Sequence, residues 1–274
     1  MDLVRTVNEG NKPNVVNQPQ KVEERPLEQK VKLHPFEETV TVPSLGKFYG
    51  GKLPGGKVKI RPIEVIEEKL MYNVRDKVAV LNKILDRCVL TKTMPLRDYL
   101  LTDRFFLLLN IFIISYGPTQ EHTYACPSCD NKFKRTVDMT KDLLLKVASD
   151  DDVEPFIVPL PMSKKTLLVR FLRGYDEEAI SLFTKQNTNS EEGDPAYSYS
   201  IARSIVSIDG KEVDESVKYN FCEHLHARDS AVLRSTIEKN STGVELVIKV
   251  ECPLCHESFR RNVDLSTQFF RPTN

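Results

Sequence analysis

Four cysteines have the spacing of a metal site. They form two Cys-Pro-x-Cys turns, the first with Cys126 and Cys129 and the second with Cys252 and Cys255. A tight turn of this kind aims both sulfurs in one direction, so each turn offers two soft thiolate ligands. A single turn would leave two positions of a tetrahedral ion open. We therefore predict one structural zinc per chain, held by all four cysteines.

Other interpretations of these cysteines stay open at this point. Redox-active CxxC motifs open a helix, whose dipole lowers the thiol pKa, whereas a strand-like Phe-x-Arg-x-Val run follows each turn here. The same sequence pattern is also compatible with ordinary surface turns that bind no metal. Alternatively, each turn belongs to its own site, completed by ligands from nearby residues. The candidates are His122 for the first turn and Cys222, His224, His226 and His256 for the second.

One shared site is the simpler interpretation, because it needs no such unequal set of extra ligands. The Cys222-x-His224-x-His226 run is then expected to be a polar approach to a helix, and Cys88 a buried core thiol. Positive charge beside the turns is expected to offset the charge of a zinc–thiolate centre. It comes from Lys132, Lys134, Arg135, Arg260 and Arg261.

The cysteine turns belong to a long internal repeat. Twelve of the 36 residues from 103 to 138 recur, without a gap, 126 positions later. Such self-similarity redefines the expected fold. It indicates two related units, each with a helix, a glycine that ends it, a strand, a cysteine turn and a second strand. The shared residues outside the turns are Asp103, Leu107, Ile111, Ser115, Gly117, Phe133, Arg135, Val137 and Asp138.

Each unit is also predicted to begin with a β-hairpin. Arg61 and Arg170 occupy matching places after the second strand of their hairpins. We expect each arginine to pair with the acidic helix start that follows it, Glu67–Glu68 in the first unit and Asp176–Glu177 in the second. The run from Gly51 to Lys57 is close to a phosphate-binding P-loop. It lacks the hydroxyl residue that would bind magnesium, and a strand follows it, so we predict a hairpin turn.

The fold class predicted from these patterns is mixed α/β (α+β), with two related units that share a zinc-ribbon-like four-cysteine site. The boundaries are an extended or disordered N-terminal arm at 1–35, a first unit at 36–150 and a second at 151–274. The arm lacks aromatic residues and cannot form a core alone. Helices are expected at 64–74, 75–90, 176–183, 197–208 and 229–239, and a largely enclosed one, capped by Thr102 or Asp103, that ends at Gly117.

Composition excludes several classes of function. The 274 residues include 39 basic and 39 acidic side chains, so no global field favours nucleic acid or anionic lipid. There is no apolar N-terminal run, and the most apolar stretch, 105–114, is too short to cross a bilayer. No catalytic or nucleotide-binding motif emerges. We therefore expect a nonenzymatic protein without a membrane segment or a small-molecule substrate.

Several short motifs together resemble one family. They are Pro43-Ser44-x-Gly46-Lys47-Phe48-Tyr49, Ile60-Arg61-Pro62, Glu67-Glu68-Lys69, Leu85-Asp86-Arg87-Cys88, the segment 103–117, and the two cysteine turns with a closing Phe269-Phe270-x-Pro272. From about residue 36 to 272 the chain resembles the baseplate hub and hub-assembly proteins of T-even-like contractile-tailed bacteriophages.

The resemblance implies a nonenzymatic structural component of the tail baseplate, or a factor that helps to build its hub. Its partners would be other baseplate and hub proteins, and its location the virion tail, after assembly in the host cytoplasm. The alternative function is a zinc-ribbon nucleic-acid-binding protein, against which zero net charge counts. An enzyme with a solvent-open metal site is a third hypothesis.

Overall fold

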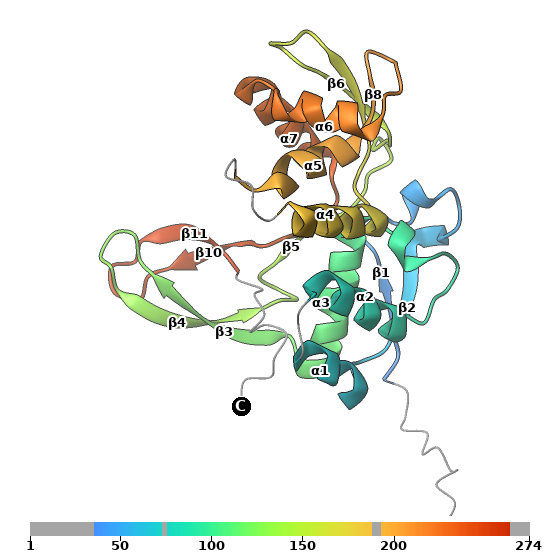
Figure 1. Ribbon diagram of the computed structural model, residues 1–274. Helices are drawn as coiled ribbons and strands as arrows, with labels where there is room; N and C mark the ends of the chain where they lie inside the picture. Colours follow the sequence, from blue (N-terminus) through green and yellow to red (C-terminus); the bar gives the residue numbers. More distant parts are fainter. Residues whose placement is uncertain (1–35, 73–75, 188–192, 264–274) are drawn as a thin grey trace, which may run out of the picture. The chain divides into compact units, whose positions relative to one another are not determined.

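A computed structural model describes residues 36–72, 76–187 and 193–263 of the chain. The predicted arm at 1–35 and the closing Phe269–Pro272 motif lie outside these residues. Within them the fold is the predicted mixture of helices and small antiparallel sheets (Figure 1). The division into units near residue 150 stays a prediction. None of the described helices is long and apolar enough to span a bilayer.

The first half, up to the segment after the first cysteine turn, is built around one buried helix, α3, which contributes seven buried residues. The β1–β2 hairpin is extended on its β2 side by a bridge between Ile60 and Val89, directly after α2. The elements are β1 (Glu38–Thr41), β2 (Lys57–Ile60), α1 (Val65–Tyr72), α2 (Lys77–Cys88), α3 (Leu101–Tyr116), β3 (Thr119–Ala125), β4 (Lys132–Asp138) and β5 (Leu144–Lys146).

The second half has a similar order of elements, with a third strand, β8, where the first half has only the bridge at Val89, and with an additional helix, α6. Its sheet has the strand order β6-β7-β8, and all neighbouring strands are antiparallel. The elements are β6 (Phe156–Pro159), β7 (Thr166–Val169), α4 (Gly174–Gln186), α5 (Pro195–Ser204), β8 (Ile205–Ile208), α6 (Glu215–Glu223), α7 (Ala227–Asn240), β9 (Gly243–Glu245), β10 (Val247–Glu251) and β11 (Ser258–Asn262).

The helix expected over 197–208 was wrong at its C-terminal end. Helix α5 stops at Ser204, and Ile205–Ile208 forms the edge strand β8. Burial alternates along this strand, with Ile205 and Ser207 buried and their neighbours half-buried. Pairing with β7 therefore decides the conformation of these β-branched residues, where a helix would have continued the same apolar pattern. Helix α6 was not predicted as a separate element.

A buried aspartate near the start of a helix holds the turn of each hairpin. Asp103, in the first turn of α3, accepts hydrogen bonds from the Ser44 backbone N–H (3.1 Å), the Ser44 hydroxyl and the Tyr49 hydroxyl (2.5 Å). Its repeat partner Asp229, in α7, accepts the backbone N–H groups of Met162 (2.7 Å) and Ser163 (2.8 Å).

The expectation that Thr102 or Asp103 caps α3 was therefore wrong. The residue that precedes the helix is Leu100, which provides no side-chain cap. Asp103 points to the hairpin instead, because a fully buried carboxylate is stable only where donors surround it. Burial raises the pKa of Asp103, although the bonds from Ser44 and Tyr49 oppose this change.

The glycine-rich segment is a hairpin loop, as predicted. Strand β2 begins at Lys57, directly after a short 3-10 helix at Pro54–Gly56. Gly46 has a φ of 77°, and a Cβ atom built on it would lie 1.8 Å from the Leu53 carbonyl oxygen. Only glycine permits this approach of two backbone segments. The loop therefore folds onto itself instead of presenting amide groups to a phosphate.

The predicted arginine–carboxylate pairs are confirmed in both halves. Arg61 contacts both oxygens of Glu67 at 3.2 Å, and Arg170 contacts both oxygens of Asp176 at 2.7 and 2.9 Å. In each pair the arginine also donates to the carbonyl of the residue after it, and the carboxylate accepts the backbone N–H three residues before it. The same network is thus built twice.

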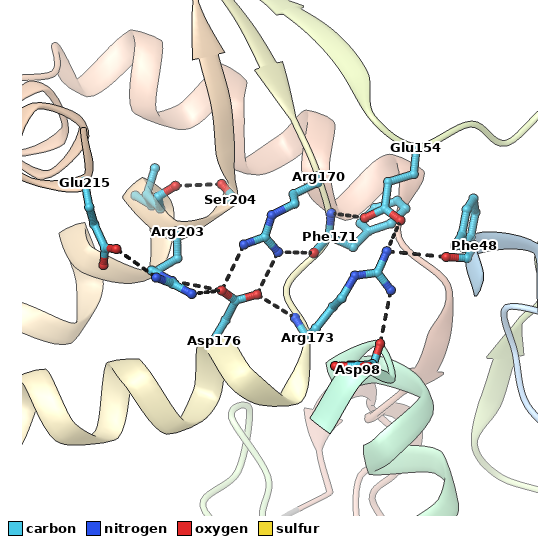
Figure 2. A network of polar contacts seen from close by, with 11 residues as sticks. Phe48, Asp98, Glu154, Arg170, Phe171, Arg173, Asp176, Arg203, Ser204 and Glu215 are labelled. Carbon is cyan, nitrogen blue, oxygen red and sulfur yellow. Dashed lines mark hydrogen bonds and ion pairs between the residues drawn. The ribbon is translucent and has the colours of Figure 1, made fainter. Parts of the chain in front are cut away.

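A second arginine joins each pair from the following helix. Arg203 of α5 donates to Asp176 at 2.8 Å and also pairs with Glu215 (Figure 2). In the first half, Arg87 of α2 lies 3.6 Å from Glu67. Burial alone would raise the pKa of Asp176, but the bonds from Arg170, the Arg173 N–H and Arg203 lower it overall. These charges hold a hairpin and two helices together.

Arg173 links the two halves and has no arginine counterpart in the first. Its guanidinium donates to Glu154 (2.6 Å) and to the carbonyl oxygens of Asp98 (3.3 Å) and Phe48 (3.4 Å), as Figure 2 shows. The next residue, Gly174, donates its N–H to the Tyr99 carbonyl at 3.1 Å. This arginine therefore connects the first hairpin loop, the approach to α3 and the second hairpin.

The charge network generates a stability prediction. We expect Asp176→Ala to lower the free energy of unfolding by about 3–5 kcal/mol, because it leaves two partly buried arginines without their carboxylate. Urea denaturation with an unchanged m value measures this loss. The control is Lys134→Ala, which removes an exposed pair with Glu121 and should leave the free energy of unfolding almost unchanged. Equal losses in the two variants would contradict the structural role of Asp176.

Candidate metal centre

The four predicted cysteines come together at one place. Each Cys-Pro-x-Cys turn lies between the strands of a hairpin, β3–β4 for the first and β10–β11 for the second, and the two hairpins lie side by side (Figure 1). The sulfurs of Cys126 and Cys255 are 3.6 Å apart, and those of Cys129 and Cys252 are 3.7 Å apart. All four sulfur atoms lie within 4.8 Å of one another.

These distances fit a tetrahedral ion. A zinc–sulfur bond of about 2.3 Å places the sulfurs of a tetrahedral site about 3.8 Å apart. Both of these pairs join one turn to the other, so neither turn forms the cluster alone. Among the described residues, this cluster contains no histidine or carboxylate. Cys88 and Cys222 lie elsewhere, as buried thiols of the core.

The two turns have the same backbone geometry. In the first, the Cys126 N–H donates to the Asn131 carbonyl and the Asp130 N–H to the Cys126 carbonyl, both at 3.0 Å. In the second, Cys252 and His256 make the matching bonds at 2.9 and 3.0 Å. Asp130 and His256 both adopt the left-handed conformation, with φ of 55° and 59°. That conformation closes the turn and brings its two sulfurs together.

The cluster is half-buried. The first cysteine of each turn, Cys126 or Cys252, is buried, whereas Cys129 and Cys255 are exposed. Donors that reach sulfur include the Ser128 N–H, 3.4 Å from Cys126, and the Asn131 side chain, 3.9 Å from Cys252. Such donors stabilise thiolate charge, so the site suits an ion that is closed off on one side by protein.

Two thiols of the cluster have pKa values that are shifted in opposite directions. Burial raises the pKa of Cys252, but the backbone N–H groups of Cys255 and Leu254 and the thiols of Cys255 and Cys129 lower it to about 6. The Asn131 N–H lowers the pKa of Cys129, whereas Cys255, burial and the remaining thiols raise it to about 12. Their titration belongs to the cluster as a whole. Because metal binding requires thiolates, a bound cation would displace the shared protons.

The basic residues beside the turns have other partners than the sulfurs. Arg135 donates to the Lys249 carbonyl at 2.5 Å and pairs with Asp142 at 3.5 Å, so it ties the first hairpin to the second. Lys134 pairs with Glu121 at 2.7 Å. Arg261, the repeat counterpart of Arg135, lies over the ring of Phe259, 5.0 Å from its centroid. The expected charge compensation by these side chains stays a prediction.

The histidines proposed as outside ligands lie away from the cluster. His256 contacts Glu251 at 3.3 Å, and the Nδ1 atom of His224 lies 2.8 Å from the Asn220 carbonyl at the end of α6. Cys222 is buried in the same helix. The run ends at His226, which directly precedes α7, so it leads into a helix as predicted. The sequence did not predict the contacts of Arg173 or the role of Asp103 as a buried acceptor. For Asp103 the one indication in the sequence was that the internal repeat has the same residue at position 229.

The comparisons with known proteins agree with this architecture. The family described as T4 bacteriophage base plate protein matches residues 37–271 of the chain. The chain belongs to this family. The match includes both hairpins and all four cysteines. It confirms the resemblance to phage baseplate proteins, whereas the hub role stays a prediction. Neither the curated proteins nor the solved structures compared with this chain give a match.

Convergence of the two turns predicts non-additive cysteine substitutions. We expect Cys126→Ser and Cys252→Ser each to lower the free energy of unfolding in zinc-containing buffer by a similar amount. The double variant should be little worse than either, because ligands of one ion act as a unit. Denaturant titrations of the four proteins measure the coupling. Losses that add would show that the two turns act independently.

Proposed function

We propose that this phage baseplate protein is a nonenzymatic component of the tail hub, or a factor that assembles it, and that a structural zinc stabilises it. The family match supports the baseplate role. The observation that carries the zinc proposal is the approach of four sulfurs, two from each half, to tetrahedral spacing. Function then lies in contacts with other baseplate proteins, in the virion tail and, during assembly, in the host cytoplasm.

The zinc would join two hairpins that are small by themselves. Each is two-stranded, and an isolated two-stranded hairpin is marginally stable in water. Beside the cysteines, the contacts between the hairpins include the Phe133–Phe259 ring pair and the Arg135–Lys249 bond. A metal held by both hairpins would add folding free energy to these contacts. Cys126, Cys129, Cys252 and Cys255 are the proposed ligands.

The charged side chains of the chain favour a structural role over catalysis. Glu67, Asp103, Asp176 and Asp229 are all buried, and each accepts hydrogen bonds from neighbouring elements of the fold. They therefore hold hairpins and helices in place. With zero net charge, the protein also lacks the overall field that attracts nucleic acid or an anionic membrane.

Metal analysis tests the proposed zinc. We expect one zinc per chain in protein purified without chelator, and loss of that zinc in Cys129→Ser. Cys222→Ser is the matched control, since it changes a buried thiol outside the cluster and should keep the metal even where stability falls. Elemental analysis by mass spectrometry measures both. Two metals per chain, no metal, or equal loss in the control would overturn the proposal.

The baseplate role is tested separately on particles. Antibody labelling of purified virions should place the protein at the tail baseplate, or, for a pure assembly factor, find it on baseplate intermediates and not on finished tails. A parallel titration with DNA and RNA should show no salt-dependent binding. Specific binding that weakens steeply with salt, together with no association with tails, would favour the nucleic-acid-binding alternative.

A further inference from the structure

One contact between the two halves is made by backbone groups at the start of α4. The Leu101 N–H donates to the Leu172 carbonyl at 3.0 Å, and the Gly174 N–H donates to the Tyr99 carbonyl at 3.1 Å. The middle residues of these two short segments form an antiparallel bridge. We call this contact, between residues 99–101 and 172–174, the internal junction. It places the start of α4 on the loop before α3.

The loop before α7 has the same backbone conformation as the loop before α3. It lies 126 positions later, at residues 225–227. The residue that precedes the helix, Leu100 or His226, has a φ of −56° in both loops, with ψ of 144° and 139°. Leu100 is buried in the internal junction, whereas His226 is exposed. Among the described residues, no backbone segment pairs with the loop at 225–227.

The start of α1 is equivalent to the start of α4. Val65, the first residue of α1, corresponds to Gly174, the first residue of α4. Gly174 is buried in the internal junction, whereas Val65 is 64% exposed and Ile66, which follows it, is 54% exposed. The Ile63 N–H bonds to the Ser115 hydroxyl at 2.9 Å, but the internal junction uses the groups that correspond to the Ile63 carbonyl and the Val65 N–H. The chain thus has both surfaces of a second junction.

The charges beside these two surfaces are complementary. In the internal junction, Arg97 in the turn before α3 lies 3.7 Å from Glu178 of α4. The residue at the place of Arg97 in the second half is Glu223, and the residue at the place of Glu178 in the first half is Lys69. Both are exposed. Opposite charges would therefore meet again in a second junction, with their signs exchanged.

The sizes of the side chains are complementary as well. A Cβ atom added to Gly174 would lie 2.8 Å from the guanidinium carbon of Arg104, so the internal junction has no room for a side chain there. In the second junction Val65 takes the place of Gly174, and Ser230 takes the place of Arg104. The Ser230 hydroxyl lies 3.5 Å from the hydroxyl of Tyr197. A larger side chain on α1 would thus meet a smaller one on α7.

We propose that copies of this chain associate head to tail, with the start of α1 in one copy on the loop before α7 in the next. The contact repeats the internal junction. Glu64 takes the place of Arg173 and cannot donate to carbonyl oxygens as Arg173 does, so this contact is weaker than the internal junction. Because each copy contributes a different surface, the association continues into a ring or a filament.

Sedimentation velocity on the full chain, over a range of concentrations, tests this contact. We expect the parent protein to form larger species as its concentration rises. Lys69→Glu and Glu223→Lys should each weaken association by about tenfold or more, because like charges then face each other. Lys134→Glu is the matched control. It makes the same change of charge on the exposed face of β4 and should leave association unchanged.

A mixture of the two variants tests whether these residues face each other. Equimolar Lys69→Glu and Glu223→Lys chains should associate about as tightly as the parent, because each variant offers the charge that the other lacks. Unchanged thermal unfolding of each variant checks that it is folded. The proposal is overturned by a parent that stays monomeric at every concentration, by association that neither variant weakens, or by a mixture that stays as dissociated as its components.

Discussion

Each half of this protein depends on a buried carboxylate that must be surrounded by donors. Asp103 and Asp229 are fully buried near the start of α3 and α7, and the donors come from the hairpin turns at Ser44 and Met162–Ser163. An uncompensated buried carboxylate would cost several kcal/mol. The hairpin can therefore occupy only the position in which its backbone N–H groups meet the carboxylate.

The helices that carry these aspartates also position the cysteines. Helix α3 ends at Tyr116 and leads directly into β3, whose end carries Cys126, and α7 leads in the same way through β9 and β10 to Cys252. The arginine–carboxylate pairs at Glu67 and Asp176 fix the neighbouring helices by the same kind of contact. In each half, the buried aspartate and the arginine–carboxylate pair thus fix the helices that lead to the cysteine turn, and the two turns together form the sulfur cluster.

Contacts could be predicted from the sequence where the two copies of the repeat have the same residue, and could not be predicted where the copies differ. The shared cysteines predicted the cluster, and matching placement predicted the Arg61 and Arg170 pairs, since each contact appears twice in the pattern. Asp103 was shared too, but a capping residue and a buried acceptor have the same sequence signature. Arg173 could not be found in this way because Glu64, which is exposed, takes its place in the first half. Strand β8 continues an apolar helical pattern, so only its pairing with β7 reveals it.

The contacts are of two kinds. The shared carboxylates and their arginine pairs hold each half together, whereas the shared cysteine turns and Arg135 join the halves. Arg173, which has no arginine counterpart in the first half, also joins them, at Phe48 and Asp98. The first hairpin loop is also much longer than the second, and its Lys47 donates to the carbonyl oxygens of Ser149 and Asp150. The two halves are therefore joined both by the shared cysteine turns and by residues that only one half contains.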